Sequence, residues 1–289
     1  MIYLVTVNYY STELLEKLIT SIQEDRNIFY QLVIVNNSPA DLSINSLKNS
    51  REILILDAGE NIGFGRACNL GLNWVYDQDP QAIVWIVNPD ALLVEKSLKE
   101  AYQFVAANPE VSITGTSVYE PNGNVWFAGG QFAPQNGKII ASEGVLPPEC
   151  SAYVPVDWVT GCSMLINLKH FPECPQFDSD YFLYYEDFDF CRRYAKQGHL
   201  IVFTCEIKII HHPSSITSRH PDLKQQHSIY SYLLALEKHT SPSVLFSRLA
   251  KIFVSALISL PVKPKLARNK LKGVVKYCKR VLPLWPIHF

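Results

Sequence analysis

The feature that most constrains the fold is an alternation of short apolar runs with segments of helical spacing over the first 110 residues. The β-branched, apolar runs occupy residues 2–7, 32–35, 53–56 and 82–87. Apolar side chains recur at helical spacing in residues 12–23, 64–76 and 97–107. Strands that alternate with helices usually pair in parallel and are covered by helices on both faces. We therefore expect an α/β fold.

The pattern changes at about residue 111. Short strand-like pieces are separated by turn-forming clusters at residues 121–124, 129–130, 136–137 and 147–148. Residues 186–197 return to helical spacing, and Gly198 follows, where the end of a helix favours glycine. We expect residues 1–110 and 111–240 to be two halves of one domain, of which the second is more antiparallel and richer in loops.

Charge is distributed unevenly along the chain, although its total is close to zero. The chain has 26 Lys and Arg residues against 27 Asp and Glu residues, a formal net charge of −1. No acidic residue follows Glu237, and residues 241–289 contain ten basic residues. The first 240 residues therefore carry a net charge of −11 and the tail one of +10. This asymmetry predicts that the tail meets an anionic surface.

Residues 241–289 have the pattern of basic amphipathic helices that lie in a membrane interface. Residues 244–260 and 271–282 each separate apolar side chains from a stripe of polar or basic ones. The longest apolar run, residues 252–262, is 11 residues long, whereas a helix that crosses a bilayer needs about 20. The alternative is that the apolar faces pack on the rest of the protein.

The ends of the chain and its cysteines bear on localisation. The first ten residues, MIYLVTVNYY, lack the basic region and cleavage site of a signal peptide. The seven cysteines include no C-x-x-C pair, so a zinc ribbon or a thioredoxin-type site is not expected. We expect a cytoplasmic protein that associates peripherally with the inner face of the membrane, with Trp285 and Phe289 as headgroup anchors. No nucleic-acid partner is expected, because the apolar side of the tail favours lipid.

Gly63 and Gly65 precede a predicted helix and are followed by Arg66. Backbone amides and an arginine at a helix N-terminus can approach a phosphate. The alternative is a tight turn with no ligand. No P-loop sequence occurs, and Cys68 takes the place of the third glycine in a dinucleotide fingerprint.

The tripeptide Asn88-Pro89-Asp90 directly follows the predicted strand at residues 82–87. Ligands of open α/β sheets bind beyond the carboxyl ends of the strands. A carboxylate at this place can hold Mg²⁺ or Mn²⁺ together with the oxygens of a diphosphate. The alternative is a simple strand-to-helix turn.

Residues 184–193, YYEDFDFCRR, place two aromatic side chains directly before Glu186 and Asp187. Dipole complementation and pairing of Asp189 with Arg193 explain part of this segment. They leave the aromatic pair unexplained, and an aromatic wall beside a carboxylate suits a sugar ring and a general base. The helix N-terminus is expected to keep Asp187 ionised at neutral pH.

A series of short motifs appears along residues 1–220 in a defined order. They are residues 5–9 (VTVNY), 36–38 (NNS), 61–71 (NIGFGRACNLG), 88–90 (NPD), 160–164 (TGCSM), 186–189 (EDFD) and the pair His211 and His212. In this order they resemble the family 2 glycosyltransferases with the GT-A fold, especially the branch of bacterial rhamnosyltransferases. The resemblance implies a mixed sheet flanked by helices, with the basic helical tail beyond it.

The resemblance also implies roles for individual residues. Those implied to bind the nucleotide sugar are Thr6, Asn8, Tyr9, Asn36, Asn61, Gly63, Phe64, Arg66, Asn69 and Asn88. Asp90 would bind the metal, Mg²⁺ or Mn²⁺, and either His211 or His212 would approach the metal or the diphosphate. Asp187 would be the catalytic base, with Glu186 beside it.

The sequence departs from the family pattern at two places. Relatives often carry Asp before the Asn-x-Ser segment, where it reads the nucleobase, whereas this chain has Val35 and Asn36. Asp41, three residues after Ser38, is a possible substitute. The D-x-D metal motif is reduced to Asn-x-Asp, which leaves Asp90 as its single carboxylate.

The resemblance implies an inverting transfer of a sugar, rhamnose by analogy, from a dTDP-, UDP- or GDP-linked donor. The acceptor would be a hydroxyl of a glycan or of a polyprenyl-diphosphate-linked sugar in the assembly of cell-surface polysaccharide. One alternative is an inactive carbohydrate-binding or scaffold module on the same fold. Another is a nucleotidyltransferase, but residues 8–11 lack the Gly-rich loop that this class places after its first strand.

Overall fold

A computed structural model describes the chain except for residues 24–27, 145, 148–151, 213–220 and 282–289. Trp285 and Phe289, the predicted membrane anchors, lie outside the described residues. The elements of the first half are β1 (Ile2–Asn8), α1 (Thr12–Gln23), β2 (Tyr30–Asn36), η1 (Leu42–Asn49), β3 (Ile53–Asp57), α2 (Phe64–Gln78), β4 (Ile83–Val87), β5 (Ala91–Leu93) and α3 (Ser97–Ala107). The predicted alternation of strands and helices is confirmed, and α1 and α3 have the predicted bounds.

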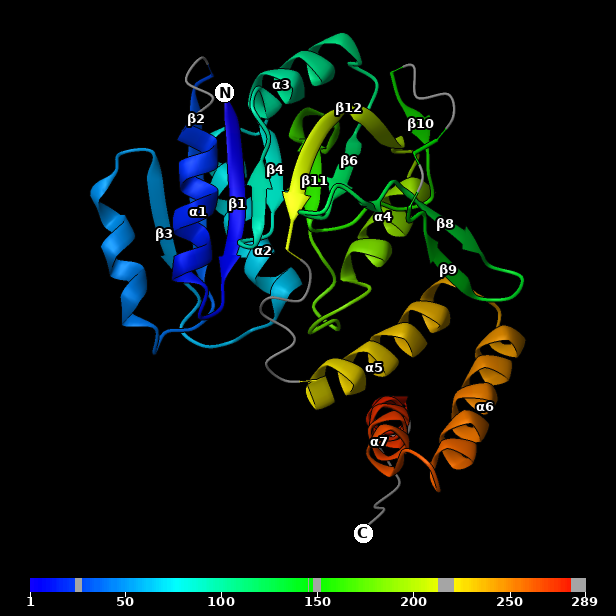
Figure 1. The fold of residues 1–289 in the computed structure, drawn as a ribbon. Helices are drawn as coiled ribbons and strands as arrows, with labels where there is room; N and C mark the ends of the chain where they lie inside the picture. Colours follow the sequence, from blue (N-terminus) through cyan, green and yellow to red (C-terminus); the bar gives the residue numbers. More distant parts are fainter. Residues whose placement is uncertain (24–27, 145, 148–151, 213–220, 282–289) are drawn as a thin grey trace.

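The central sheet is parallel where the sequence predicted parallel pairing. Strands β4, β1, β2 and β3 lie side by side in that order, all in parallel register. The chain moves along the sheet in opposite directions through α1 and α2. Because such crossovers are right-handed, the two helices cover opposite faces of the sheet (Figure 1).

The second half extends the same sheet with strands of both directions. Its elements are β6 (Ile113–Tyr119), β7 (Val125–Phe127), β8 (Gly130–Ala133), β9 (Lys138–Ala141), β10 (Val154–Pro155), β11 (Ser163–Asn167), η2 (Leu168–His170), α4 (Glu186–Lys196) and β12 (Ile201–His211). Strand β11 is antiparallel to both β4 and β6, and β12 is parallel to β6. Strands β8 and β9 form a separate hairpin. The mixed sheet expected from the resemblance is therefore present.

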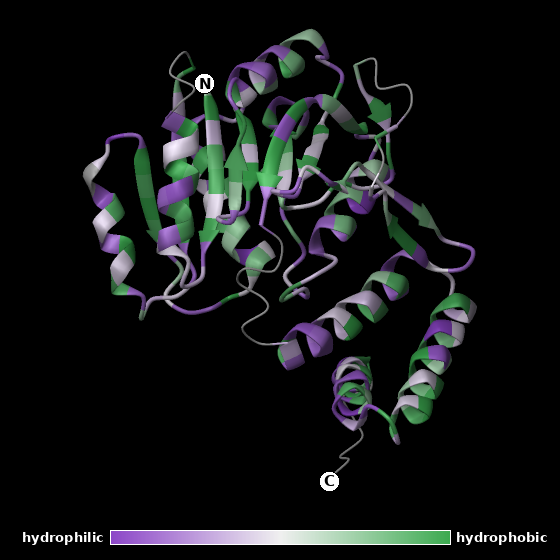
Figure 2. Ribbon diagram, viewed as in Figure 1, coloured by the Kyte–Doolittle hydropathy of each residue, from purple (hydrophilic) through white to green (hydrophobic). Residues whose placement is uncertain are grey.

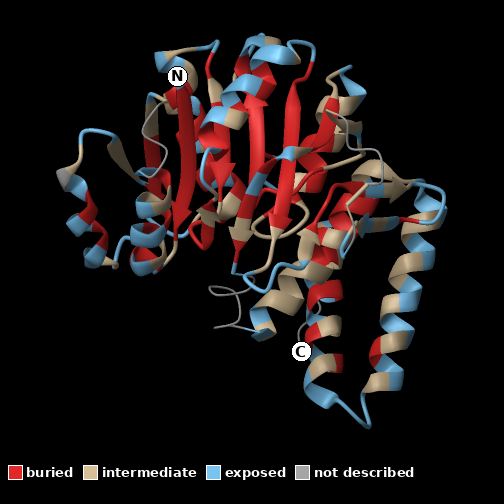
Figure 3. Cartoon of the chain, turned by 45° about the horizontal axis from the view of Figure 1, so that its top comes forward, coloured by how far each residue is buried: buried red, intermediate tan, exposed pale blue. Residues whose placement is uncertain are grey.

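The hydrophobic core lies on both faces of this sheet. All seven residues of β1 and the last five of β2 are buried. Figure 2 shows apolar strands in the middle of the molecule, and Figure 3 shows the same strands as its most deeply buried part. A strand that is covered on both faces has no solvent side, so its sequence is continuously apolar rather than alternating.

Three helices follow the sheet: α5 (Pro221–His239), α6 (Pro242–Ser259) and α7 (Pro264–Val281). Helix α5 was not predicted from the sequence. It packs against α7 in a second core cluster formed by Tyr181, Phe188, Tyr230, Leu233, Leu234, Ala235, Val274 and Tyr277. Gly273 allows the close approach, because a Cβ there would lie 2.7 Å from Cβ of Ile229. For α7, the alternative of packing on the rest of the protein is therefore correct.

Helix α6 remains largely uncovered. Of its residues only Ala256 is buried, whereas Phe246 is 67% and Ile258 71% exposed. Its 18 residues have a mean hydropathy of 1.4, so it is long and apolar enough to cross a membrane by length and composition alone. The prediction that this part of the chain is too short to cross a membrane counted only the apolar run of residues 252–262. Helix α6 begins ten residues earlier and includes Arg248 and Lys251.

Candidate active site

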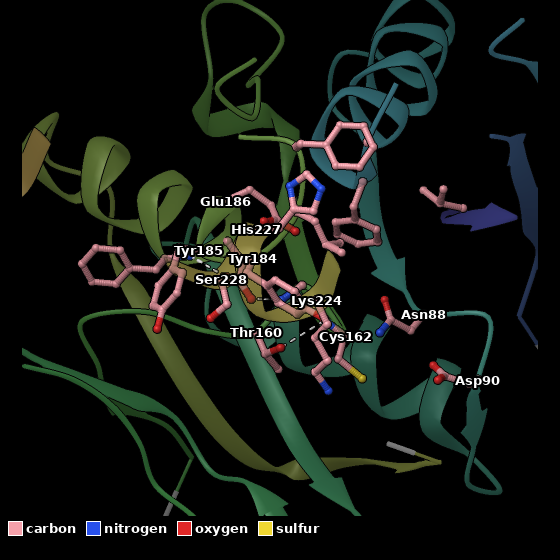
Figure 4. A pocket seen from close by; sticks show the side chains of 18 of the residues that line it. Asn88, Asp90, Thr160, Cys162, Tyr184, Tyr185, Glu186, Lys224, His227 and Ser228 are labelled. Carbon is pink, nitrogen blue, oxygen red and sulfur yellow. Dashed lines mark hydrogen bonds between the residues drawn. The ribbon is translucent and has the colours of Figure 1, made fainter. Parts of the chain in front are cut away.

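The carboxyl ends of the parallel strands open into a cavity of about 890 Å³. The ends of β1 and β4 supply one wall, and the segment that leads into α4 supplies a second. Helix α5 supplies a third wall with Leu223, Lys224, His227 and Ser228. Figure 4 shows residues of these walls facing the same space. The position agrees with the rule that ligands bind beyond the carboxyl ends of strands.

A buried network of amides and hydroxyls shapes the first wall. The Asn8 side chain donates to Oδ1 of Asn36 at 3.1 Å, to Oγ of Ser38 at 3.2 Å and to Oδ2 of Asp41 at 3.2 Å. Asn8 and Asn36 therefore bind each other instead of lining the cavity. They fix the turn after β1, which presents Tyr9 to the cavity.

The loop before α2 is fastened to the end of β2 and to the segment that leads into α4. Asn37 donates from Nδ2 to Oδ1 of Asn61 at 3.0 Å and accepts from the backbone of Ile62 at 2.9 Å. Gly63 has φ +89°, and a Cβ there would lie 2.4 Å from the carbonyl oxygen of Phe182. Only glycine fits this close approach, so the expected glycine turn also serves to dock the loop on the segment that leads to α4.

Asp90 and His211 come together at the inner end of the cavity. Oδ1 of Asp90 lies 3.2 Å from Nε2 of His211, and both side chains are 5% exposed. Trp126 packs edge-on against the imidazole ring, with 4.5 Å between the ring centroids. His212 is exposed and its backbone N–H donates to the carbonyl of Asp90 at 3.0 Å. Of the two adjacent histidines, His211 is the one whose side chain lines the cavity.

Asp187 stands at the start of α4 with its carboxylate held by the neighbouring loop. Oδ2 accepts from the backbone N–H of Gly161 at 2.9 Å, and Oδ1 accepts from that of Phe188 at 2.8 Å. Burial raises the pKa of Asp187, while these amides and the Thr160 hydroxyl oppose the rise. The helix N-terminus therefore offsets the effect of burial on this acid only in part.

Glu186 is more deeply buried than Asp187. Its Cβ lies under α2, 3.5 Å from where a Cβ at Gly65 would be. Oε2 of Glu186 is buried and has no hydrogen-bond partner among the described residues. Burial, followed by the charge of Asp187, raises the pKa of Glu186 to about 8. The two adjacent carboxyl groups therefore differ in environment, and only Asp187 has backbone donors on both oxygens.

The turn before α4 is strained. Tyr184 and Tyr185 have φ of +70° and +64°, values that residues other than glycine rarely adopt. Each such residue costs on the order of 1–3 kcal/mol unless its surroundings impose it. Ser231 of α5 donates to the carbonyl of Leu183 at 2.8 Å, and Tyr232 packs on Tyr185 at 5.6 Å. Helix α5 thus helps to hold the two aromatic residues against the cavity.

The comparisons with known proteins agree with this geometry. A family model described as Glycosyl transferase family 2 matches residues 2–159, more than half of the chain. The chain belongs to glycosyl transferase family 2. The matched region includes β1, the loop before α2 and Asp90, all of which contribute to the cavity.

Curated relatives of this family 2 chain are sugar transferases. N-acetylglucosaminyl-diphospho-decaprenol L-rhamnosyltransferase of Mycobacterium tuberculosis is 25% identical over 213 residues, which cover 65% of this chain and 68% of that protein. The low-salt glycan biosynthesis hexosyltransferase Agl10 of Haloferax volcanii is 24% identical, with 71% of this chain and 64% of that protein covered. Rhamnosyltransferase WbbL of Escherichia coli is 22% identical, with coverages of 73% and 83%. The protein is a glycosyltransferase.

Solved structures confirm the fold class. S. aureus TarS 1-349 in complex with UDP aligns with a TM-score of 0.58 at 15% identity, covering 98% of this chain and 82% of that one. The mannosyltransferase PcManGT of Pyrobaculum calidifontis, in complex with GDP-Man and Mn²⁺, aligns with a TM-score of 0.55 at 13% identity, covering 99% and 88%. The mixed α/β GT-A fold expected from the sequence is thus shown.

The structure brings most of the predicted site residues of the family 2 fold to one place. Those that line the cavity are Tyr9, Asn61, Gly63, Phe64, Asn88, Asp90, Glu186, Asp187 and His211. Those that lie elsewhere are Thr6, Asn8, Asn36, Arg66, Asn69 and His212. Arg66 donates to the backbone of Ser179 at 3.0 Å, and Asn69 exchanges two hydrogen bonds with the backbone of Phe177. In this structure these two side chains brace the loop that leads to α4.

Asp41, the possible substitute for a nucleobase-reading Asp, also lies outside the cavity lining. Its Oδ2 accepts from Thr12 at 3.3 Å in addition to Asn8, so it is part of the turn network.

Sequence reasoning did not identify the residues that α5 and the β7–β11 region contribute. These include Trp126, Trp158, Leu223, Lys224, His227 and Ser228. The signal for α5 was present: Pro221 and Asp222 suit a helix start, and Lys238 and His239 suit its end.

A divalent metal fits the pair Asp90 and His211. Oδ1 of Asp90 is buried and makes no hydrogen bond among the described residues, although Nε2 of His211 lies 3.2 Å from it. Across the described chain no group of three or more His, Cys, Asp or Glu residues is arranged to hold a metal. Two protein ligands suit a Mg²⁺ or Mn²⁺ ion that takes its other ligands from substrate phosphates and water.

Proposed function

We propose that this glycosyltransferase moves a sugar, rhamnose by analogy with its relatives, from a nucleoside diphosphate to an acceptor hydroxyl with inversion. The observation that carries the proposal is the placement of Asp187 and of the pair Asp90 and His211 on the same cavity. An inverting displacement needs a base on the acceptor side and charge compensation on the leaving-group side. This chain supplies both kinds of side chain in one space.

In this proposal Asp187 removes the proton from the acceptor hydroxyl as that oxygen attacks the anomeric carbon. The backbone donors at Gly161 and Phe188 fix the orientation of its carboxylate. The raised pKa of Asp187 makes it a stronger base than an exposed aspartate. No covalent sugar–enzyme intermediate is required, so ping-pong kinetics would count against the scheme.

Asp90 and His211 would hold the Mg²⁺ or Mn²⁺ ion, which neutralises charge on the leaving nucleoside diphosphate when it is bound. The neighbouring residues Asn61, Gly63 and Asn88 would position the nucleotide sugar at the strand ends. The donor nucleotide, dTDP, UDP or GDP, is a further part of the proposal. The related structures named above hold UDP or GDP-Man.

The acceptor is proposed to be a glycan or a sugar on a polyprenyl diphosphate, in the assembly of cell-surface polysaccharide. The name of the mycobacterial relative describes such an acceptor, N-acetylglucosaminyl-diphospho-decaprenol. A lipid-linked acceptor requires the enzyme to work at a membrane. Helix α6 exposes Phe246, Val254 and Ile258, and residues 241–289 contribute ten basic side chains.

We therefore propose that α6, through its exposed apolar face, and α7, through its exposed basic side chains, bind the anionic inner face of the cell membrane peripherally. Each basic residue close to an anionic leaflet contributes about 1 kcal/mol. The apolar face of α6 would enter the headgroup region, as amphipathic interfacial helices do.

A thermal-shift panel tests the donor site. The protein is heated with dTDP, UDP, GDP or CDP, each with Mn²⁺ or with a chelator. A ligand present at about 100 times its dissociation constant adds about 2.7 kcal/mol of stability. Stabilisation by one diphosphate, and only with metal, supports the proposal and names the nucleotide. If no diphosphate stabilises the protein under either condition, the proposed donor site is refuted and the alternative of an inactive carbohydrate-binding module on the family 2 fold is favoured.

A further inference from the structure

The charges around the cavity are strongly unbalanced. Four acidic side chains line it: Asp90, Glu143, Glu186 and Asp187. Among the described lining residues, Lys224 is the one lysine or arginine. The ligand of the proposed function carries a diphosphate, which the ionised carboxylates repel. Glu186, whose pKa is raised to about 8, adds no charge near pH 7. A bound metal and Lys224 are therefore the groups that can offset this repulsion.

Lys224 reaches the cavity from a well-defined helix face. Leu223, Lys224, His227 and Ser228 follow the one-turn spacing of α5, so they lie together on the side that faces the strand ends. Figure 4 shows Lys224, His227 and Ser228 around the same space as Thr160 and Cys162. The opposite side of α5 faces α7, where Nε2 of Gln226 donates to Asn269 at 3.1 Å.

Helix α5 is fixed at several points relative to α4 and its leading loop. Ser231 binds the carbonyl of Leu183, and His239 lies 2.8 Å from the carboxylate of Asp189 in α4. Lys238 forms an ion pair with Asp178. The backbone that carries Lys224 is thus held in a set relation to Asp187, two residues before Asp189.

A second polar group lies one turn along from Lys224. Nδ1 of His227 is buried and lacks a hydrogen-bond partner among the described residues. The ring stacks on Phe182 with 4.8 Å between centroids. Burial, followed by the charge of Lys276, lowers the pKa of His227 to about 4, so this imidazole is neutral near pH 7. His227 can exchange a hydrogen bond with a ligand but does not supply the positive charge.

We propose that Lys224 binds phosphoryl oxygens of a diphosphate in this cavity, with His227 as a neutral hydrogen-bond partner beside it. The inference rests on the proposed function and deepens it, since it assigns a diphosphate contact to α5, outside the motifs that identify the family. Lys224 is a positioning residue that offsets ligand charge, and the base remains Asp187. The diphosphate belongs either to the nucleotide donor or to a polyprenyl-linked acceptor.

The test compares three full-length variants with the wild type: Lys224→Met, the conservative Lys224→Arg, and Lys17→Met, which removes an exposed lysine of α1 outside both the cavity and the tail. Thermal unfolding checks that each variant folds. Calorimetry with Mn²⁺ measures the dissociation constants of the diphosphate that the wild type binds and of the matching monophosphate. Kinetics measure the KM of an acceptor sugar on a polyprenyl diphosphate and of the same sugar on a neutral alkyl chain.

If Lys224 contacts the donor, Lys224→Met raises the dissociation constant of the nucleoside diphosphate roughly 10- to 100-fold and spares the monophosphate. If it contacts the acceptor, nucleotide binding is unchanged and KM rises only for the diphosphate-linked acceptor. In either case Lys224→Arg retains most of the wild-type affinity. The inference is overturned if Lys224→Met matches Lys17→Met in all four measurements, or if Lys224→Met weakens binding of the mono- and the diphosphate equally. A wild type that binds no nucleoside diphosphate instead overturns the proposed function itself, and this inference with it.

Discussion

Nε2 of His239 lies 2.8 Å from Oδ1 of Asp189, and both side chains are almost completely buried. Arg193 donates to the other carboxylate oxygen at 2.7 Å. Asp189 is two residues beyond Asp187 in α4, whereas His239 ends α5. This contact therefore joins the helix that presents the proposed base to the helix that closes the cavity.

Asp189→Asn is expected to destabilise the protein by about 3 kcal/mol at pH 7, because it leaves the Arg193 guanidinium without its buried counter-charge. Burial alone would raise the pKa of Asp189, but the hydrogen bond and charge of His239 and the charge of Arg193 outweigh it and lower the pKa. A lowered pKa stabilises the fold above the unfolded value of about 4, and this contribution is lost as the pH falls through the folded value.

Urea unfolding at several pH values measures the difference in the free energy of unfolding between Asp189→Asn and wild type. The difference should be largest near neutrality and shrink below about pH 4. Asp180→Asn is the matched control. Asp180 forms ion pairs, but its side chain is 45% exposed, so its substitution should lower the free energy of unfolding by less than about 1 kcal/mol. Equal losses in the two variants would contradict the importance of the buried contact.

Glu186→Gln is expected to change how stability depends on pH. Because the pKa of Glu186 is raised to about 8, the unfolded chain binds fewer protons than the folded one from about pH 4.3 upward. The wild type should therefore lose stability as the pH rises from about 4.3 to about 8, by up to roughly 1.4 kcal/mol per unit. The Gln variant lacks this slope, whereas the exposed control Glu60→Gln retains it. Parallel stability profiles for Glu186→Gln and wild type would show that the site does not hold a protonated acid.

His211→Ala is expected to abolish the metal-dependent part of stabilisation by a nucleoside diphosphate. Its imidazole faces Asp90 in the cavity, whereas the side chain of His212 is exposed. His212→Ala should therefore retain the Mn²⁺-dependent thermal shift. If loss of His212 and not of His211 removed the metal effect, the assignment of the metal pair would be wrong.

Substitution of the exposed face of α6 should weaken membrane binding. Phe246→Asp combined with Ile258→Asp is expected to lower association with phosphatidylglycerol vesicles roughly tenfold or more, because each apolar side chain contributes about 1.5–3 kcal/mol on burial. Phe29→Asp alters an 89% exposed phenylalanine outside the tail and is the control. Vesicle sedimentation measures the effect, and the comparison requires that the variants have the same Tm as the wild type. Unchanged sedimentation of the double variant would refute docking through α6.

Deleting residues 241–289 is a poorer test of membrane binding. Helix α7 shares a buried cluster with α5, and Tyr277 donates to Glu237 of α5 at 2.9 Å. The deletion would expose that cluster as well as remove α6.

The alternating half of the fold could be predicted because each of its elements carries its own periodic pattern. Helix α5 has start and end signals but no single apolar stripe, since its apolar residues serve two surfaces. Leu233 and Leu234 are adjacent and both fully buried, so no single apolar stripe marks the helix.

The site was predictable to the level of motifs but not of side-chain direction. His211 and His212 are adjacent at a strand end, where successive side chains point to opposite sides, and only the fold shows which one faces Asp90. Asn8 and Asn36 were expected to meet a ligand, but their amides satisfy each other across neighbouring strands. Lys224 belongs to no motif, and its place in the cavity depends on how α5 packs.

Asp187 is the residue on which the proposed sugar transfer depends most directly, because it is the proposed base. We would measure the rate of transfer and the dissociation constant of the nucleoside diphosphate for wild type and Asp187→Asn, with a sugar donor that carries the nucleotide identified by the thermal-shift panel. The account predicts that transfer falls by about 10²–10⁴-fold or more while nucleotide binding is unchanged. Transfer at the wild-type rate, or loss of nucleotide binding together with transfer, would contradict it.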